Sequence, residues 1–456
     1  MYIVKRTTKY LIFLYLLIAI LTNSNAQKSN LNNPINSFSF DVYNDIKSDS
    51  NNIFFSPYSI YSTLLLVHEG ANGKTKEKLE QILYIKNNSI PKFIDNTEIA
   101  EVKIANSIWL DKKYKFDKKY KKAITAKYDV ALETIDFENP NSAIAIINQW
   151  TAENTNQKIN KLLSPNDIDS LNKAIFLNTV YFNGEWKKQF NNKNTTISTF
   201  FKNENENYKI DFLNTKEGLQ YYANEELQFI TKPYKDSGLS FCVILPLQLN
   251  GYKEIEDKLS HQFIHKLLDN MTFETIKLSL PKIKLTGDYN LEETELFSDL
   301  NSYSDFSIIK NQALNSVNIK HKSLLELNAK GTVAIAATAM KIIITGVPHV
   351  IDFNANHPFI FFIMDNKTQS IVFMGRYNQP PQEKKTSTKE ISFSKTTNHY
   401  TKEPLYLLDN KKIKTLEGID AQDIESINIL PVAEATDKYG DSRKNGAIII
   451  TTKHKE

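Results

Sequence analysis

Cysteine is almost absent from this chain of 456 residues, which contains one, Cys242. A single thiol cannot form an internal disulfide, so the fold must be held together by packing. Cys242 stands between Phe241 and Val243 in the apolar segment 239–247. This setting predicts an inert thiol buried in a strand, because reactive thiols lie in polar, partly exposed surroundings.

An excess of charge of one sign is also missing. The 56 lysine and arginine residues nearly balance the 52 aspartate and glutamate residues, and the net charge is +4. The lysines are scattered and do not form the concentrated basic stripe that binds nucleic acid. We therefore expect no nucleic-acid partner.

Long apolar runs are absent after residue 26, so no later segment is predicted to cross a membrane. The first residues differ, because basic residues precede an apolar run over 10–21 and the small residues Ser-Asn-Ala follow at 24–26. This order is typical of a signal peptide, residues 1–26, that is cleaved after export. The protein would then act in the periplasm, at the cell surface or outside the cell. An uncleaved anchor is the alternative, although the run is short for a membrane span.

Catalytic and metal-binding motifs are missing as well. Residues 73–75, Gly-Lys-Thr, resemble the end of a phosphate-binding loop, but His68 occupies the place of its first glycine. His261 and His265 are one helical turn apart without a third ligand, so they are predicted to be surface histidines. The chain contains no GxSxG motif and no coherent set of nucleophile, base and oxyanion donor. We expect a protein that is not an enzyme and needs no metal or cofactor.

The chain does contain a continuous pattern of helices and strands over residues 27–379, which predicts one large domain. Apolar residues at three- and four-residue spacing predict helices at 36–47, 56–69, 75–83, 118–128 and 142–155. Runs rich in Ile, Val, Phe and Leu predict strands at 174–182, 239–245, 275–281, 321–327, 359–364 and 371–375. The elements do not alternate as βαβ units, so the pattern predicts an α+β fold with extensive antiparallel sheet.

The composition changes after this domain. Residues 380–403 are polar and rich in lysine and threonine, which predicts a solvated linker. Apolar periodicity returns in residues 404–456 and predicts a second, small module.

The large domain contains a series of short motifs that resemble one family in their order. The motifs are Asn-Ile-Phe-Phe-Ser-Pro-Tyr-Ser-Ile at 52–60, Ala-Asn-Ser-Ile-Trp at 105–109, Asn-Thr-Val-Tyr-Phe-Asn-Gly-Glu-Trp at 178–186, Lys-Pro-Tyr at 232–234, Ile-Lys-His-Lys at 319–322, Lys-Gly-Thr at 330–332, His-Pro-Phe at 357–359 and Phe-Met-Gly-Arg at 373–376. Through these motifs the domain resembles the serpins, a family of protease inhibitors. The resemblance implies a serpin fold, with a large central β-sheet, surrounding helices and an exposed reactive-centre loop.

The segment 330–352 takes the place of that loop. On its own pattern, a buried strand followed by a turn at residues 345–348 would explain it equally well. The resemblance implies instead that a protease cuts this segment and that the cut loop enters the central sheet as an extra strand, an established case of strand addition. The protein would thus be a suicide substrate for a serine or cysteine endopeptidase.

The start of this loop is the predicted hinge of insertion. The hinge residues are Gly331, Thr332, Val333, Ala334, Ile335, Ala336 and Ala337. If Thr332 points inward, alternation along the strand also places the small side chains of Ala334 and Ala336 on the inward face. Ala329, Val333 and Ile335 depart from the inhibitory hinge pattern of the family, which leaves a non-inhibitory carrier or binding protein as an alternative.

Matched to the family from Gly331 and from Phe353, the loop length implies a reactive bond at Thr345–Gly346, to within one or two residues. Ile343 and Ile344 precede it, so we expect elastase-like, subtilisin-like or papain-like target proteases. A trypsin-like protease would cut at Lys341, which shortens the inserting arm and predicts cleavage without trapping.

The resemblance also assigns a group of polar residues beneath the sheet that controls its opening. They are Ser56, Ser59, Asn178 and His321, the predicted shutter. Buried polar groups must hydrogen-bond to one another, so a satisfied core network is an equally good description of them.

Residues 404–456 resemble the plug segment of TonB-dependent outer-membrane receptors, but no barrel strands follow. We interpret this part as a small αβ, plug-like module whose strands could pair with an envelope partner, with an inert relic as the alternative. If this end dominates, the chain would be an envelope docking protein. We expect the protein to be a monomer.

Overall fold

The computed structural model describes most of the chain after residue 32. The described residues are 33–48, 51–86, 102–165, 167–168, 173–298, 300, 305–310, 312–314, 317–331, 349–381, 405–409, 411–413, 424–430 and 447–452. The chain divides into two compact units, Met1–Gln382 and Glu383–Glu456. The predicted signal peptide 1–26 lies outside the described residues, as does most of the predicted linker 380–403.

The first unit contains the five helices with predicted ranges, each end within two residues of its predicted position, and shorter helices after residue 250. They are α2 (Pro34–Ile46), α3 (Pro57–Gly70), α4 (Gly73–Ile82), α5 (Lys118–Lys127), α6 (Pro140–Asn154), α7 (Tyr252–Lys258), α8 (His261–Asp269) and α9 (Glu295–Ser298), with 3-10 turns at η2 (Asn192–Asn194) and η3 (Leu291–Glu293). Three of them, α2, α3 and α6, begin with a proline after a capping Asn33, Ser56 or Asn139. Proline suits the first helical position because its missing N–H would have no partner there.

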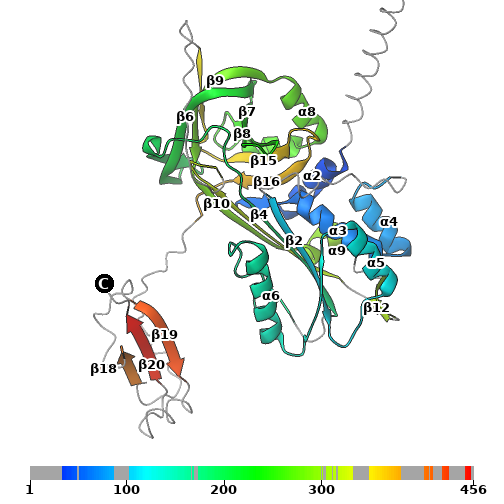
Figure 1. Cartoon of the computed structure of the whole chain (residues 1–456). Helices are drawn as coiled ribbons and strands as arrows, with labels where there is room; N and C mark the ends of the chain where they lie inside the picture. Colours follow the sequence, from blue (N-terminus) through cyan, green and yellow to red (C-terminus); the bar gives the residue numbers. More distant parts are fainter. Residues whose placement is uncertain are drawn as a thin grey trace, which may run out of the picture. The chain divides into compact units, whose positions relative to one another are not determined.

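A five-stranded sheet forms the centre of this unit (Figure 1). Its strands, in spatial order, are β10 (Ile283–Asn290), β13 (Asn318–Leu327), β4 (Ala174–Phe182), β2 (Val102–Asp111) and β3 (Ala131–Ile135). β13 runs antiparallel to β10 but parallel to β4, with His321 opposite Asn178. We call the contact between these two parallel strands the β4–β13 junction.

A second sheet contains most of the remaining strands. Its path is β1 (Ile53–Phe55), β16 (Ile371–Tyr377), β15 (Phe359–Asp365), β8 (Leu239–Pro246), β7 (Leu227–Pro233), β6 (Asn207–Ala223), β9 (Thr272–Pro281) and β14 (Val350–Asn354), and β5 (Thr196–Phe201) pairs with β6. A two-stranded sheet pairs β11 (Phe306–Ile309) with β12 (Gln312–Leu314). Every residue of β8, β15 and β16 is buried, which explains their continuous apolar sequences. Cys242 lies fully buried in β8, so its predicted burial in a strand is confirmed, and burial raises the pKa of its thiol.

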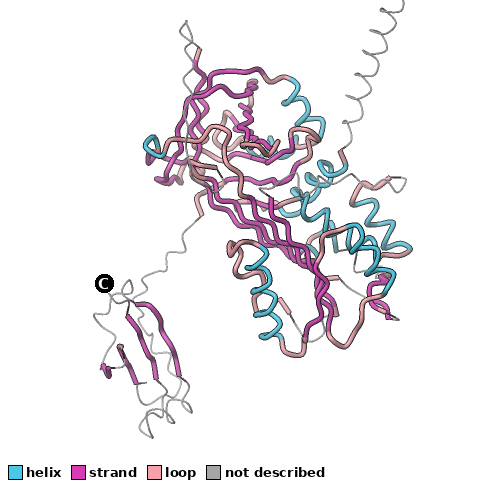
Figure 2. The backbone as a smooth tube through the Cα atoms, viewed as in Figure 1, coloured by secondary structure: helices cyan, strands magenta, loops and turns pink. Residues whose placement is uncertain are grey.

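Helices cover both faces of the five-stranded sheet (Figures 1 and 2). On one face, Ala143 and Ile147 of α6 join Leu177 of β4 in an apolar cluster. On the other, Ser59 of α3 hydrogen-bonds to Asn178 of β4. Successive residues of β4 thus face opposite layers, as the pleat of a strand requires.

The α+β class and the extensive antiparallel pairing are confirmed, with two corrections. β6 is the longest strand of the described residues, 17 residues, and was not predicted because exposed polar residues interrupt its apolar alternation. His261 is 6% exposed, so the prediction that it lies at the surface is wrong. The helix was located correctly, but its first turn packs inward.

The second unit contributes strands to the described residues. They are β17 (Leu405–Leu408), β18 (Lys411–Ile413), β19 (Ile424–Leu430) and β20 (Ala447–Thr452), in the spatial order β18-β17-β20-β19. Leu405, Leu407 and Ala447 form a small buried cluster. The predicted plug-like identity of this unit stays a prediction.

Candidate functional site

The structure describes five of the predicted site residues: Ser56, Ser59, Asn178, His321 and Gly331. The other hinge residues, 332–337, and the predicted reactive bond with its flanking residues, 343–346, lie outside the described residues. The described part of the site consists of the predicted shutter residues and of the strand and glycine that lead into the predicted loop.

Ser56 and Ser59 lie at the first turn of α3, beneath the sheet. Ser56 caps the helix, since its Oγ accepts the backbone N–H of Ser59 at 3.1 Å. The same hydroxyl donates to the carbonyl oxygen of Val372 in β16 at 2.7 Å. Both serines are fully buried. The helix start is thereby fixed to the second sheet.

His321 joins this helix start to β13. Its Nε2 accepts the backbone N–H of Ser56 at 3.2 Å, so this nitrogen carries no proton. Its Nδ1 lies 2.5 Å from Oδ1 of Asn178 and donates to it. The imidazole is therefore neutral, with its proton on Nδ1. Burial lowers the pKa of His321 to about 3, because a buried imidazolium would lose its hydration, and the nearby carboxylate of Asp288 opposes this only weakly.

Asn178 connects His321 with α3 and β2. Its amide lies within 2.9 Å of the Ser59 hydroxyl and donates through Nδ2 to Oδ1 of Asn106 at 2.6 Å. Asn106 also accepts the hydroxyl of Thr63 at 2.9 Å. The predicted shutter residues thus meet in one network, which we call the inner network: Ser56, Ser59, Asn106, Asn178 and His321.

Asn106 was missed as a network member, although it stands within a quoted motif. A signal for it exists in the strand register, because Asn106 of β2 is directly opposite Asn178 of β4. Neighbouring strands place opposite side chains on the same face. The pairing of β2 with β4 could not be predicted from the sequence alone.

The chain leaves β13 through a tight contact with residues 184–190. Gly331 has φ of +143°, and a Cβ there would lie 2.2 Å from the carbonyl oxygen of Gly184, so only glycine fits. The backbone N–H of Trp186 donates to the carbonyl oxygen of Lys330 at 3.1 Å, and that of Phe190 donates to Ala329 at 2.8 Å. The loop therefore begins from a fixed position at the end of the sheet.

A buried ion pair, also missed in the sequence, supports this position. Lys232 and Glu217 are 0% and 5% exposed and contact each other directly. The ammonium group of Lys232 lies 4.7 Å from the ring centre of Phe190 and donates to the carbonyl oxygen of Lys188 at 2.9 Å. Burial lowers the pKa of Lys232, and Glu217 opposes that shift. Lys232 stands in the quoted Lys-Pro-Tyr motif, but its partner is 15 residues away in another strand.

Within the described residues, no group of three or more His, Cys, Asp or Glu side chains is placed to hold a metal ion. In the same part of the chain, no helix combines the length and apolar character that a membrane span requires.

Comparisons with known proteins agree on one family. The model of the family Serpin (serine protease inhibitor) matches residues 33–380. The leukocyte elastase inhibitor of Xenopus laevis is 32% identical over 378 residues, covering 77% of this chain and 100% of the relative. Serpin B3 of Homo sapiens is 31% identical over 380 residues, covering 75% and 97%. The solved structure of native protease nexin-1 with heparin has a TM-score of 0.67 and 26% identity, over 76% of this chain and 100% of that one. The predicted serpin fold is confirmed.

Proposed function

The chain belongs to the serpin family, and from this membership we propose that it inhibits endopeptidases as a suicide substrate whose cut loop inserts at the β4–β13 junction. The arrangement of the strands around the loop supports the proposal. β13 ends at Leu327, and β14, which follows the loop, lies at an edge of the other sheet. A cut between them would leave the first part of the loop attached to β13 alone.

The direction of the strands also favours this position. An arm that turns back from the end of β13 runs antiparallel to β13. Because β4 is parallel to β13, the arm would be antiparallel to both neighbours, which is the more stable pairing. The 14 residues from Thr332 to Thr345 would extend about 46 Å, and the 10 residues of β13 span about 33 Å. An arm cut at Thr345 is thus long enough to cover the whole strand.

In the proposed reaction the protease supplies the nucleophile. Its serine or cysteine attacks the carbonyl carbon of Thr345, the peptide bond to Gly346 breaks, and an acyl-enzyme remains. Insertion of the arm then carries the protease away before water hydrolyses the acyl bond. The small polar Thr345 after Ile343 and Ile344 favours elastase-like, subtilisin-like or papain-like targets. One relative carries the name leukocyte elastase inhibitor, which agrees with this preference.

The single observation that carries the proposal is the parallel β4–β13 pair directly before the loop. To test it, the purified protein is incubated with elastase, subtilisin and papain and examined on denaturing gels. We expect an SDS-resistant band at the summed mass of the protein and the protease. The released peptide, identified by mass spectrometry, should begin at or near Gly346. A nicked protein that melts no higher than the intact one would contradict the proposal.

A matched pair of loop variants sharpens this test. Ala334→Arg places a large charge on the face predicted to turn inward, so cleavage should continue while the adduct is lost. Val333→Arg places the same group on the opposite face and should keep the adduct. If both variants behave alike, the proposed insertion register is wrong.

A non-inhibitory carrier is the second candidate, and the residues that favour it are Ala329, Val333 and Ile335, which depart from the inhibitory hinge pattern. Such a protein would be cut in the loop without an adduct and without a rise in melting temperature.

We also propose export through residues 1–26 and an envelope partner for residues 404–456. Deleting the residues after Gln379 separates the two roles. An inhibitor should keep its activity, whereas an envelope docking protein should lose its function.

A further inference from the structure

A segment between α6 and β4 crosses the face of the five-stranded sheet that α6 covers, which we call the outer face. We call residues 155–168, of which 166 is not described, the covering segment. It turns away from α6 at Asn156 and Gln157, whose φ angles are +51° and +59°. The left-handed backbone of these two residues ends the helix and directs the chain back over the sheet.

On one side the covering segment is fixed to α6 and β4. Oδ1 of Asn148 in α6 accepts the backbone N–H groups of Leu162 and Leu163 at 2.8 Å, and its Nδ2 donates to the carbonyl oxygen of Leu163 at 2.9 Å. Both leucines are 1% exposed and share an apolar cluster with Ile175 and Leu177 of β4. These contacts hold the segment to the β4 side of the junction.

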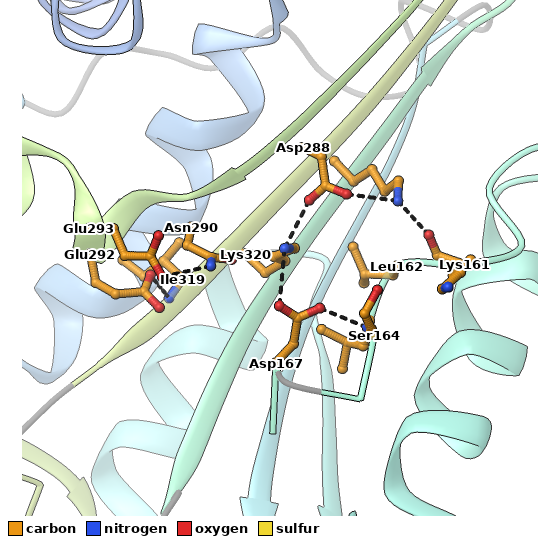
Figure 3. A network of polar contacts seen from close by, with 12 residues as sticks. Lys161, Leu162, Ser164, Asp167, Asp288, Asn290, Glu292, Glu293, Ile319 and Lys320 are labelled. Carbon is orange, nitrogen blue, oxygen red and sulfur yellow. Dashed lines mark hydrogen bonds and ion pairs between the residues drawn. The ribbon is translucent and has the colours of Figure 1, made fainter. Parts of the chain in front are cut away.

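On the other side, charged residues of β13 hold the same segment (Figure 3). Nζ of Lys320 lies 3.4 Å from Oδ1 of Asp167, whose second oxygen accepts the backbone N–H of Ser164 at 2.7 Å. Nζ of Lys322 donates to the carbonyl oxygen of Lys161 at 2.5 Å. Lys320 and Lys322 are two residues apart in a strand, so both side chains lie on the outer face. His321 between them faces the inner network.

Asp288 of the neighbouring strand β10 keeps both lysines in position. Its two oxygens lie 2.9 Å from Nζ of Lys320 and 3.0 Å from Nζ of Lys322. Burial acts to raise the pKa of Asp288, but the two lysines lower it below its usual value. Burial acts to lower the pKa of Lys320, but Asp288 and Asp167 raise it. Asp288 and Lys320 are therefore both charged at neutral pH. We call Asp167, Asp288, Lys320, Lys322 and the carbonyl of Lys161 the outer network.

The covering segment thus joins the two strands that an inserting arm must separate. An apolar contact adds to this, since Ile159 packs with Tyr181 of β4 and Leu324 of β13. β10 and β13 lie on the same side of the junction, so the bonds of Asp288 do not cross it. The bonds from Lys320 and Lys322 to the covering segment do cross it, and they must break or stretch when β13 moves away from β4.

We infer that the outer network sets the rate at which the β4–β13 junction opens to admit the cut loop, with Lys320 and Asp167 as positioning residues for insertion. This inference rests on the proposed function and deepens it. Lys320 and Asp167 are only 11% and 18% exposed, so salt weakens their bond in part, and less than it weakens an exposed pair. Slower opening gives water more time to release the protease, so the network also sets the fraction of protease that is trapped.

The test compares three Asp→Asn variants of the full chain. Asp167→Asn removes a bond across the junction. Asp288→Asn removes bonds that lie on one side of it. Asp211→Asn serves as the control. It breaks an exposed ion pair near the start of β6, in the other sheet, where Oδ2 of Asp211 lies 2.7 Å from Nζ of Lys282. The measurements are the first-order rate of adduct formation at saturating protease and the number of inhibitor molecules consumed per protease trapped.

We expect Asp167→Asn to raise the insertion rate about two- to fivefold and to lower the number of molecules consumed. Asp288→Asn and Asp211→Asn should stay within about twofold of the unmodified protein. Added salt should accelerate the unmodified protein toward the rate of Asp167→Asn and leave that variant almost unchanged. Lys320→Gln removes the same bond from the other partner and provides the test if Asp167→Asn folds poorly.

Three outcomes separate the ways in which the inference can fail. If adducts form and Asp167→Asn and Lys320→Gln insert at the unmodified rate, the outer network has no role in opening, while the proposed function stands. A lower melting temperature of both intact and cleaved forms, with an unchanged rate, would mean that the bond is only structural. If no protein forms an adduct, the proposed function is wrong and the role of the network is lost with it.

Discussion

The inner and outer networks lie on opposite faces of the same two strands, and they are built from different chemistry. The inner network is neutral and fully buried at Ser56, Ser59, Asn178 and His321. The outer network consists of ion pairs and one hydrogen bond from Lys322 to a backbone carbonyl, and Asp288 within it is 44% exposed. Water can replace a lost partner on the outer face but not on the inner one. We therefore expect the inner network to determine the stability of the intact protein and the outer network to adjust the rate of opening.

The largest effect should come from breaking the inner network. Asn178→Ala removes the partner of the His321 Nδ1–H, the Ser59 hydroxyl and Asn106 in a place that water does not reach. Each unsatisfied group costs about 1–3 kcal/mol, so the free energy of unfolding should fall by about 3 kcal/mol or more. Urea unfolding measures this. Asn270 is exposed at the end of α8, where its side chain donates to the carbonyl oxygen of Lys266. Asn270→Ala is the matched control and should change the free energy by less than about 0.5 kcal/mol. A loss below about 1 kcal/mol for Asn178→Ala would remove the distinction between the two faces.

The two networks differ in how much of each could be predicted from the sequence. The apolar run of β4, with its single buried Asn178, and the strand that contains His321 were predicted, because strand patterns and family motifs are local features. Asn106 was not assigned, since its role depends on the register between β2 and β4.

The outer network could not be predicted, because Asp167 and Lys320 are 153 residues apart and neither belongs to an apolar pattern. The quoted motif at 319–322 contains Lys320 and Lys322, but a surface lysine carries no signal of its partner. The packing of the covering segment on the sheet decides that partner, and tertiary contacts of this kind leave no periodic trace in the sequence.

A pH titration between pH 6 and pH 5 should give the next largest effect, and in this range it acts through His321 on the inner face. The pKa of His321 is about 3 in the folded protein and about 6.5 in the unfolded chain. The unfolded chain therefore takes up a proton first as the pH falls, so the contribution of His321 to stability is complete above pH 6.5 and is lost on acidification toward pH 3. The expected loss is about 1.4 kcal/mol per pH unit in this window.

The measurement compares the pH dependence of unfolding in the unmodified protein with that of His321→Gln, so that other titrating groups cancel. Tyr289 stacks on His321 with 6.4 Å between ring centres, but burial raises its pKa to about 12, so it stays neutral throughout. Equal slopes for the two proteins between pH 6 and pH 5 would mean that His321 is protonated in the fold, which contradicts its acceptor bond from Ser56.

The smallest effect should come from the edge of the outer network. Lys158 of the covering segment lies 3.7 Å from Glu326 of β13, and the two side chains are 35% and 24% exposed. Lys158→Met keeps the length of the side chain and removes this bond, while Glu326 keeps Lys284 at 2.9 Å. Exposed pairs of this kind contribute about 0.2–1 kcal/mol, and the difference from the unmodified protein should vanish in about 1 M salt, where the Debye length is about 3 Å. Urea unfolding at low and high salt measures the free energy of unfolding under both conditions.

A loss of free energy as large as that of Asn178→Ala, or one that salt leaves unchanged, would show that water is excluded from the outer face as it is from the inner one. The two networks would then hold the junction by the same means.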